Sequence, residues 1–423
     1  MARSALLMLA LRIVALGLTF IASVITARVL GPASRGQLAV MIAIPGLIAA
    51  LGLLGADSAN LYFAGRSPAA HASVVRFAAV HAVIAAFAVV GLVLIAIVWD
   101  SARLGLDLPV FIGAAALAPI LVFGMLAGAA EAGRGRAPAV AGITALAAAA
   151  WLTGAAIVAV AGLGEPETLF AIFASAQILL AIALLGLSWP TSWRAKTIPA
   201  GTYLRYALST NASGIALLVL LRLDIPLIQT LAGPREVGLY SVALPMAESL
   251  LLLSTVIGVV LLPNSAAGLV DHRKAVSIAQ LATLVSGFVA LVLAAAAPAL
   301  VVTVFGEAYA GAVPLLWALL PGLVLLTAGR TLQTHLVANG LFRTPTAGAV
   351  VALALCLVLE LILIPRLGAM GAALASSISY AIFAVIQARA VTRLSGGAWL
   401  EPFMPPPGST VRLAIAGIRR SAP

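Results

Sequence analysis

Hydrophobic residues run along the chain in long blocks that short polar or Gly/Pro-rich stretches separate. A helix that spans a membrane needs about 20 apolar residues, and windows of that length predict about twelve such helices. Six are expected in the first half, near residues 5–28, 37–63, 75–99, 109–130, 138–162 and 168–188. Six more are expected in the second half, near residues 203–231, 237–262, 274–304, 311–336, 346–365 and 369–391. The pattern therefore predicts an all-α polytopic membrane protein.

The turn between the first two predicted helices recurs in the second half of the chain. Aligned without a gap, Gly31-Pro32 falls on Gly233-Pro234, and Gly36 falls on Gly238. Gly tolerates positive φ, while Pro fixes φ and lacks a donor, so the pair marks a sharp turn. Two unrelated membrane hairpins could share these residues. A Pro-interrupted helix follows both turns, however, and this favours an internal duplication with a binding site between pseudo-symmetric halves, as in secondary transporters.

The duplication predicts two six-helix lobes around a central cavity. We expect an N-terminal lobe at residues 1–188, an inter-lobe cytoplasmic linker at 189–202 and a C-terminal lobe at 203–394. A Pro- and Gly-rich basic tail at 395–423 follows. The end of this tail has two interpretations, a basic amphipathic helix on the anionic inner leaflet or a disordered segment.

The composition excludes several classes of protein. Of the 423 residues, 63% are hydrophobic and 9% are charged, and the mean hydropathy is +1.18. A water-soluble domain could not bury so much apolar surface. Cys356 is the single cysteine, which excludes an internal disulfide and a thiolate metal cluster. With four scattered histidines and no nucleotide-binding Gly-x-x-x-x-Gly-Lys-Ser/Thr motif, we expect neither a metal nor another cofactor.

The basic residues predict a topology rather than a nucleic-acid partner. The formal net charge is +11, but Lys and Arg occur singly or in pairs beside apolar segments. With the N-terminus in the cytoplasm, sixteen of them fall in inner loops and termini and five in outer loops. The positive-inside rule therefore places both termini in the cytoplasm.

Polar residues within the predicted spans gather in the first two helices of each half. Because charges in a membrane are costly, they usually face a cavity or a partner. Three sets recur at helical spacing and predict one hydrated, partly cationic cavity: Arg12, Thr19, Ser23 and Thr26; Asn211, Arg222 and Gln229; and Ser241, Glu248 and Thr255.

Each of these residues also has a structural interpretation. Ser and Thr in membrane helices often only bond the preceding turn or a neighbouring helix. Arg222 could pair with Asp224 or Glu248, and Arg12 could extend toward the cytoplasmic surface. Arg28 and Arg35 flank the outer turn, where an interfacial position is expected.

The two turn segments carry a resemblance to a known family. Ala27-Arg28-Val29-Leu30-Gly31-Pro32, followed by Arg35-Gly36-Gln37, resembles the first hairpin of Wzx-type flippases for lipid-linked oligosaccharides. These belong to the multidrug/oligosaccharidyl-lipid/polysaccharide flippase superfamily. Leu221-Arg222-Leu223-Asp224, then Gly233-Pro234 and Val237-Gly238-Leu239-Tyr240, resembles the start of that family's second half. The resemblance covers most of the chain to about residue 395, and implies alternating access through a central cavity.

From this resemblance we expect a bacterial inner-membrane flippase. It would move undecaprenyl-diphosphate-linked oligosaccharide from the cytoplasmic to the periplasmic leaflet, for surface polysaccharide such as O-antigen. Arg222, Arg12 and Arg28 would meet the diphosphate, because the guanidinium fork stays charged and grips phosphate oxygens. The expected sugar contacts are Asn211, Gln229, Ser241 and Thr255, and the candidates for a coupled cation are Asp224 and Glu248.

As a flippase, the chain could act beside a polysaccharide polymerase. The sequence also leaves two other functions open. A cation-coupled multidrug exporter of the same superfamily would favour carboxylates and aromatic residues in its cavity, yet aromatics make up only 6% of the chain. A membrane polymerase or ligase of polysaccharide assembly would carry a sizeable outer loop, whereas the predicted loops are short. We therefore expect a transporter rather than an enzyme.

Overall fold

Helices account for nearly all of the structure. The computed structural model describes residues 2–66, 70–99, 108–189 and 198–405, and no strand occurs among them. The predicted end of the tail lies outside these residues. The chain packs into two compact units, residues 1–241 with 304–308, and residues 242–303 with 309–423. The predicted lobe boundary at 189–202 stays a prediction.

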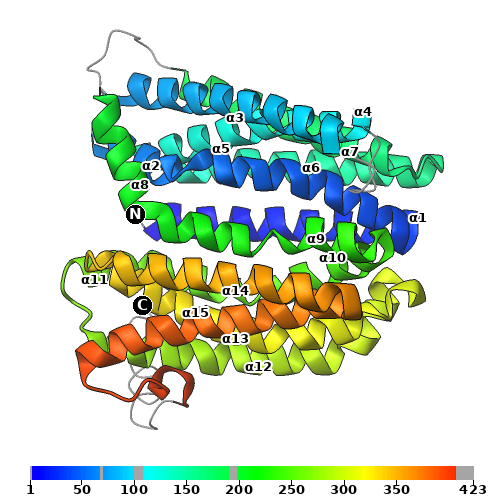
Figure 1. Ribbon diagram of the computed structural model, residues 1–423. Coiled ribbons are helices and arrows are strands. Elements are labelled where there is room, and N and C mark those ends of the chain that lie inside the picture. Colours follow the sequence, from blue (N-terminus) through cyan, green and yellow to red (C-terminus); the bar gives the residue numbers. More distant parts are fainter. Residues whose placement is uncertain (1, 67–69, 100–107, 190–197, 406–423) are drawn as a thin grey trace. The chain divides into compact units, whose positions relative to one another are not determined.

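The first unit contains nine α-helices and most of a tenth (Figure 1). Among them α3 packs on α5, and α7 packs on both α5 and α6. The bounds are α1 Ala2–Leu53, α2 Ala56–Arg66, α3 His71–Trp99, α4 Leu108–Ala116, α5 Ala118–Glu131, a π-helix η3 Ala132–Arg136, α6 Ala137–Ala161, α7 Pro166–Ser188, α8 Ala200–Leu220, α9 Asp224–Ala232 and α10 Pro234–Glu248.

The second unit holds the end of α10 and the remaining helices, except residues 304–308, which are the end of α12 and most of η4 and belong to the first unit. Within it α15 packs on α13 and α14, and α11 packs on α13. The bounds are α11 Leu251–Ala266, α12 His272–Phe305, a 3-10 turn η4 Glu307–Tyr309, α13 Ala312–Ala338, α14 Arg343–Leu367, α15 Ala369–Ser395 and a 3-10 turn η5 Glu401–Phe403.

The chain is a multi-pass membrane protein, as the hydropathy predicts. Ten segments of the described chain are long and apolar enough to cross a membrane. Two of them, Leu7–Leu53 and Leu108–Ala161, each contain two predicted spans. These divide at Gly31 and at Gly135, where φ is 68° and 81°, so the prediction of twelve spans is confirmed.

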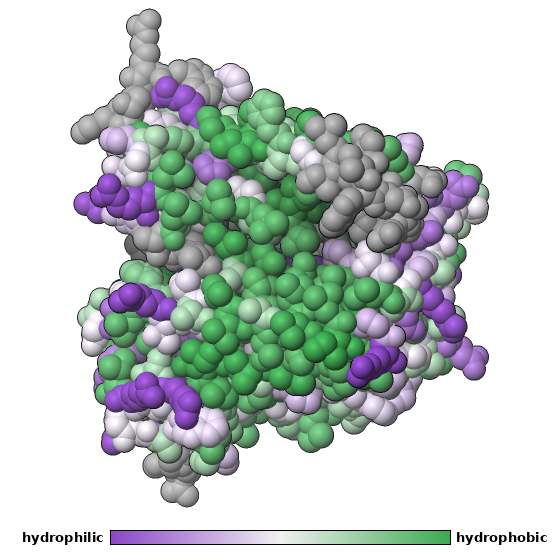
Figure 2. All heavy atoms as spheres, in the orientation of Figure 1, coloured by the Kyte–Doolittle hydropathy of each residue, from purple (hydrophilic) through white to green (hydrophobic). Residues whose placement is uncertain are grey.

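The exterior carries the apolar surface that lipid covers. Large hydrophobic side chains are exposed along the middle of the long helices, including Phe288 at 67% and Leu291 at 69% on α12. In the second unit, Figure 2 shows hydrophobic side chains over the middle of the visible face and hydrophilic ones near the helix ends. This distribution matches a unit that stands in a bilayer.

The two Gly-Pro turns have the same backbone conformation. Gly31 has φ 68° and ψ 174°, and Gly233 has φ 92° and ψ 173°. These angles are accessible only to glycine at little strain, and Pro then begins the next helix, where its missing N–H is no loss. The aligned turns therefore share both sequence and structure.

Four of the predicted spans are interrupted within their length, and in the fourth of the twelve the interruption falls between α4 and α5 at Leu117. The second span changes from α1 to α2 at Leu54 and Gly55, where φ is 45° and 79°. The seventh is interrupted between α8 and α9 at residues 221–223, and the eighth between α10 and α11 at residues 249–250. Broken helices expose backbone groups, which membrane proteins tolerate where those groups meet protein or water. The breaks mark places where a polar site can form.

Candidate functional site

The first hairpin is braced by a buried arginine. Arg35 follows the turn and is 8% exposed. Its guanidinium donates to Ser23 Oγ at 2.9 Å and to Thr26 Oγ1 at 3.0 Å, so it links the helix segments before and after the turn. Arg35 was expected at the membrane interface; the structure shows it buried inside the unit, where two hydroxyls of the preceding segment accept from its two Nη atoms.

The second hairpin is braced by a different pair at the corresponding place. Asp224 begins α9 and is fully buried. Its Oδ1 accepts a hydrogen bond from the backbone N–H of Ile225 at 2.9 Å, and its Oδ2 accepts one from the hydroxyl of Tyr240 on α10. A carboxylate at a helix N-terminus also benefits from the helix dipole. Tyr240 was missed as a site residue, although it lies in the turn segment that carries the resemblance.

Arg222 lies at the break in the seventh span. This break falls within the candidate span Ser213–Ala232, and the side chain of Arg222 is half-buried. Its Nη1 lies 3.5 Å from the carbonyl oxygen of Leu221, at the outer limit of a hydrogen bond. A charged residue within a membrane span usually faces a cavity or a polar partner.

The polar residues around this break are packed inside the first unit. Gln229 is 4% exposed, and its Oε1 has no hydrogen-bond partner among the described side chains. Ser241 is buried and donates to the carbonyl oxygen of Gly238 at 2.8 Å, as the structural interpretation of such hydroxyls predicts. Asn211 belongs to α8, and its side chain is outside the part of the structure that is described. Gln229 thus holds a buried acceptor oxygen close in sequence to the break.

The two arginines expected on the first helix are exposed. Arg12 is exposed on α1. Arg28 is exposed as well, and its Nε donates to the carbonyl oxygen of Val304 at 2.7 Å. Because α1 packs against both α8 and α9, the helix of Arg12 and Arg28 neighbours the helices that flank Arg222.

In the second unit, Glu248 ends α10 beside the break in the eighth span. Its side chain is half-buried and interacts electrostatically with Arg330, a half-buried residue of α13. Arg330 was missed, although it lies within the predicted span 311–336. Thr255 of α11 donates to the carbonyl oxygen of Leu251 at 3.0 Å, so its proton is used by its own helix.

A buried ion-pair cluster ties the helix ends of the first unit. Glu131 is fully buried at the end of α5. It accepts from Arg134 at 2.9 Å and from Arg136 at 3.3 Å, while His71 Nε2 lies 3.5 Å away. His71 Nε2 also lies 2.9 Å from the carbonyl oxygen of Ser188. The cluster therefore joins α3, α5 and α7 at one end, where it fixes structure.

The second unit has a histidine pair at the comparable helix ends. His272 begins α12 as His71 begins α3. Its Nδ1 lies 2.8 Å from Nε2 of the fully buried His335 on α13, and Ser265 Oγ lies 2.9 Å from Nδ1 of His335. One proton can bridge the two imidazoles, so the pair can hold α11, α12 and α13 together, with Asp271 as an acidic neighbour.

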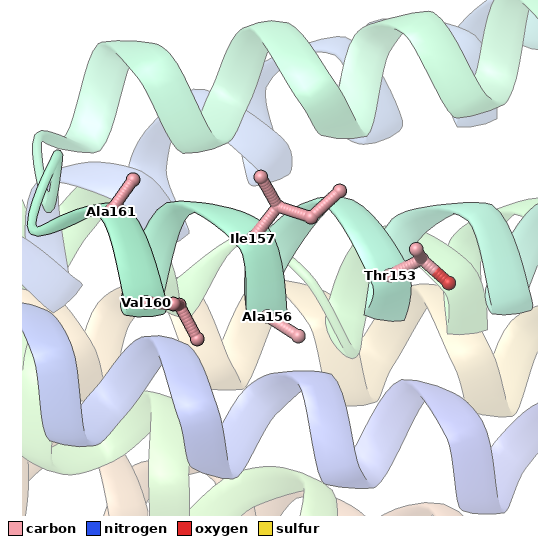
Figure 3. Close-up of a pocket in the computed structure, with 5 residues that line it drawn as sticks. All are labelled: Thr153, Ala156, Ile157, Val160 and Ala161. Atoms are coloured by element: carbon pink, nitrogen blue, oxygen red, sulfur yellow. The ribbon is translucent and has the colours of Figure 1, made fainter.

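One pocket of about 420 Å³ lies on α6 (Figure 3). The five residues that line it all belong to this helix, and only one of them has a polar side chain: Thr153, Ala156, Ile157, Val160 and Ala161. Ile157 is 62% exposed and Val160 is 91% exposed. With no charged group, this surface cannot recognise a diphosphate, so the candidate site remains at the broken helices. No group of three or more metal-ligating side chains occurs among the described residues.

Comparisons with known proteins agree with this architecture. A family model described as "Polysaccharide biosynthesis protein" matches residues 25–314. The structure is similar to a lipid II flippase, MurJ, in an inward closed conformation, with a TM-score of 0.72 and 14% sequence identity over 100% of this chain and 94% of that one. No protein in a search of curated sequences matches.

A multidrug resistance transporter has a similar structure too. This MATE family transporter of the MOP superfamily, in an inward-facing conformation, has a TM-score of 0.67 and 16% identity, over 99% of this chain and 100% of the transporter. The outward-facing conformation has a TM-score of 0.62 and 15% identity, over 99% of this chain and 96% of that one. The fold is therefore similar to those of a lipid II flippase and of a multidrug resistance transporter.

Proposed function

Because the chain belongs to the polysaccharide biosynthesis protein family, we propose that it is a bacterial flippase for a lipid-linked oligosaccharide. It moves undecaprenyl-diphosphate-linked saccharide from the cytoplasmic to the periplasmic leaflet of the inner membrane by alternating access. Both termini lie in the cytoplasm, and the protein performs no covalent chemistry. The saccharide belongs to a surface polysaccharide such as O-antigen.

The position of Arg222 is the observation that carries this proposal. A half-buried guanidinium at a break in a membrane-spanning segment offers several donors in one plane. A diphosphate presents anionic oxygens that accept such donors in pairs. An organic cation, which a multidrug exporter carries, would instead be repelled by this charge. Arg12 and Arg28 stand on the neighbouring helix α1 and add positive charge on the path of the headgroup.

The proposed sugar contacts are polar residues of helices α8 to α11. Gln229 supplies a buried carbonyl oxygen that has no hydrogen-bond partner among the described side chains, and this oxygen can accept from a sugar hydroxyl. The hydroxyl groups of Ser241 and Thr255 donate to carbonyl oxygens of their own helices, so toward a sugar their oxygens would act as acceptors. Asn211 completes the proposed set.

Energy for export can come from the membrane potential. Moving an anion out of a negative interior gains about 2.3 kcal/mol per charge per 100 mV. Of the two carboxylates proposed for a coupled cation, Asp224 accepts two hydrogen bonds, so a cation there must displace Tyr240. Glu248 interacts with Arg330, so a cation or proton there would weaken that interaction. We favour Glu248, because a cation or proton there leaves the hydrogen bond between Tyr240 and Asp224 in place.

The test is the content of lipid-linked saccharide in a strain that lacks the protein. We expect a saccharide unit on undecaprenyl diphosphate to accumulate and to be protected from a glycosidase added to the periplasm. Increased sensitivity to cationic drugs, without such accumulation, would instead support an exporter. A unit that is flipped but not polymerised would support a polymerase or ligase.

A further inference from the structure

The two Gly-Pro hairpins touch through their backbones. A methyl group added at Gly36 would overlap the carbonyl oxygen of Pro234, and one added at Gly238 would overlap the carbonyl oxygen of Pro32. All four residues belong to the first compact unit. Each glycine therefore leaves room for the turn of the other hairpin, and no other residue type fits in either place.

The contact is reciprocal, and it follows from the internal duplication. Gly36 aligns with Gly238, and Pro32 aligns with Pro234, so each repeat supplies the same two groups. This arrangement is expected on an axis that relates the two repeats by a twofold rotation. The two glycines thus mark the point where the repeats meet at the turns, on the side that the positive-inside rule places outside.

The forces within each hairpin differ from those between them. Inside the hairpins, Arg35 is hydrogen-bonded to Ser23 and Thr26, and Tyr240 is hydrogen-bonded to Asp224, with all of these groups buried or half-buried. Between the hairpins, glycine Cα atoms meet carbonyl oxygens. Such contacts are individually weak, so they hold the backbones closely and still separate readily.

We propose that Gly36 and Gly238 form the outer closure of the transport path, which must open for the substrate to leave. This inference rests on the proposed transport function, since it assigns the contact to the outward-closed state of an alternating-access cycle. Each braced hairpin moves as a unit, and the glycine contact between them is broken in the outward-open state. A side chain at either glycine prevents closure and shifts the population toward the outward-open state.

Cysteine labelling tests this without reference to the substrate. In a Cys356→Ser background, a reporter is introduced by Val237→Cys, at a fully buried position beside Gly238. Intact cells are treated with a membrane-impermeant maleimide. With Gly36→Ala we expect labelling to be about tenfold faster or more, because the labelling rate rises in proportion to the population of the outward-open state. The matched control is Gly46→Ala on the same helix, where an added methyl group meets no atom within 4 Å, and its labelling should be unchanged.

Equal labelling rates in folded Gly36→Ala and Gly46→Ala proteins would overturn the proposal. A second experiment keeps both glycines, in case the alanine variant does not fold. Cysteines at Ala33 and Arg235, aligned exposed positions beside the two turns, are joined by a short bis-maleimide. The joined protein should lose transport, and full transport would contradict the closure. If labelling responds as expected while no lipid-linked saccharide moves, the closure stands and the proposed substrate fails.

Discussion

Tyr240 on α10 donates its hydroxyl proton to Oδ2 of Asp224, the first residue of α9. Both side chains are fully buried. This bond crosses the turn of the second hairpin, and Arg35 crosses the first hairpin in the same way through Ser23 and Thr26. In both repeats a buried side-chain contact therefore links the helix segments before and after the turn, although the residues that form it differ.

Loss of the Tyr240 hydroxyl should destabilise the protein. A hydrogen bond to a charged group contributes about 1.5–3 kcal/mol, so Tyr240→Phe should lower the free energy of unfolding by about that amount. Thermal or denaturant unfolding of the purified protein measures it. Tyr62→Phe is the control: that residue is 37% exposed and its hydroxyl accepts from the exposed Arg66 at 2.7 Å, and because water can replace this surface contact we expect a change within about 0.5 kcal/mol. Additive effects of Tyr240→Phe and Asp224→Asn in a double-mutant cycle would contradict the pairing.

Arg222→Ala should abolish export while the protein still inserts in the membrane. The reason is the loss of the guanidinium that we propose binds the diphosphate. Arg222→Lys keeps the charge without the planar fork, so partial activity is expected. Complementation of the deletion strain measures both, with expression checked in the membrane fraction. Arg235→Ala, an exposed arginine of the same hairpin, should export normally. Full export by Arg222→Ala would remove the diphosphate role of this residue.

The contributions of Glu248 and Arg330 to the free energy of unfolding should depend on each other. Glu248→Gln leaves the half-buried Arg330 without its acidic neighbour, so a loss of about 1–3 kcal/mol is expected. Arg330→Gln in the same background should recover part of that loss, because two neutral amides replace two charges. Unfolding of the two single variants and the double variant tests this. A double variant whose loss equals the sum of the single losses would show that the residues act independently.

Loss of the buried Glu131 carboxylate should lower the free energy of unfolding far more than loss of the exposed Asp271 carboxylate, which also has a basic partner. Glu131→Gln leaves Arg134 and Arg136 without a buried carboxylate, and breaking a buried ion pair destabilises by about 3–5 kcal/mol. The control is Asp271→Asn, whose ion pair with Lys274 is 3.8 Å long and whose side chain is 63% exposed. Its loss should be small. Similar losses for both variants would contradict the structural role of the Glu131 cluster.

The pH dependence of this control has a defined direction. The pKa of Asp271 is lowered from its ordinary value of 3.8, first because the backbone N–H of Lys274 donates to it. A group with a lower pKa in the folded state stabilises the protein above its unfolded-state pKa and loses that effect as the pH falls through the folded-state value. The free energy of unfolding of Asp271→Asn should therefore be lower than that of the wild type at neutral pH, and the two should be equal at pH values below the folded-state pKa of Asp271.

Hydropathy alone predicted the spans well. The last predicted helix, 369–391, corresponds to α15 at Ala369–Ser395, and the fifth, 138–162, corresponds to α6 at Ala137–Ala161. Such agreement follows because each span is a separate apolar block that Gly or Pro ends, and the bilayer fixes its length. The repeated turn was also predictable, since glycine at positive φ leaves a direct trace in the sequence.

The partners of the polar residues could not be predicted in this way. Helical spacing places Ser23 and Thr26 on one face, but it does not reveal that Arg35 turns back toward them. It also gives no sign that Asp224 meets Tyr240, or that Glu248 interacts with Arg330. These pairs depend on the breaks and turns that bring separate segments together. Alignment of the repeats offers one signal, because Tyr240 and Arg35 both lie just after the repeated Gly-Pro.

Transport by the purified protein tests the central claim most directly. The wild type and Arg222→Ala are reconstituted in vesicles that contain a polyprenyl-diphosphate-linked saccharide, and a sugar-modifying enzyme outside reports the accessible pool. We predict that the wild type makes the inner pool accessible and that vesicles with Arg222→Ala match protein-free vesicles. A wild-type protein that leaves the inner pool protected, yet carries an organic cation across the same membrane, would contradict the flippase function.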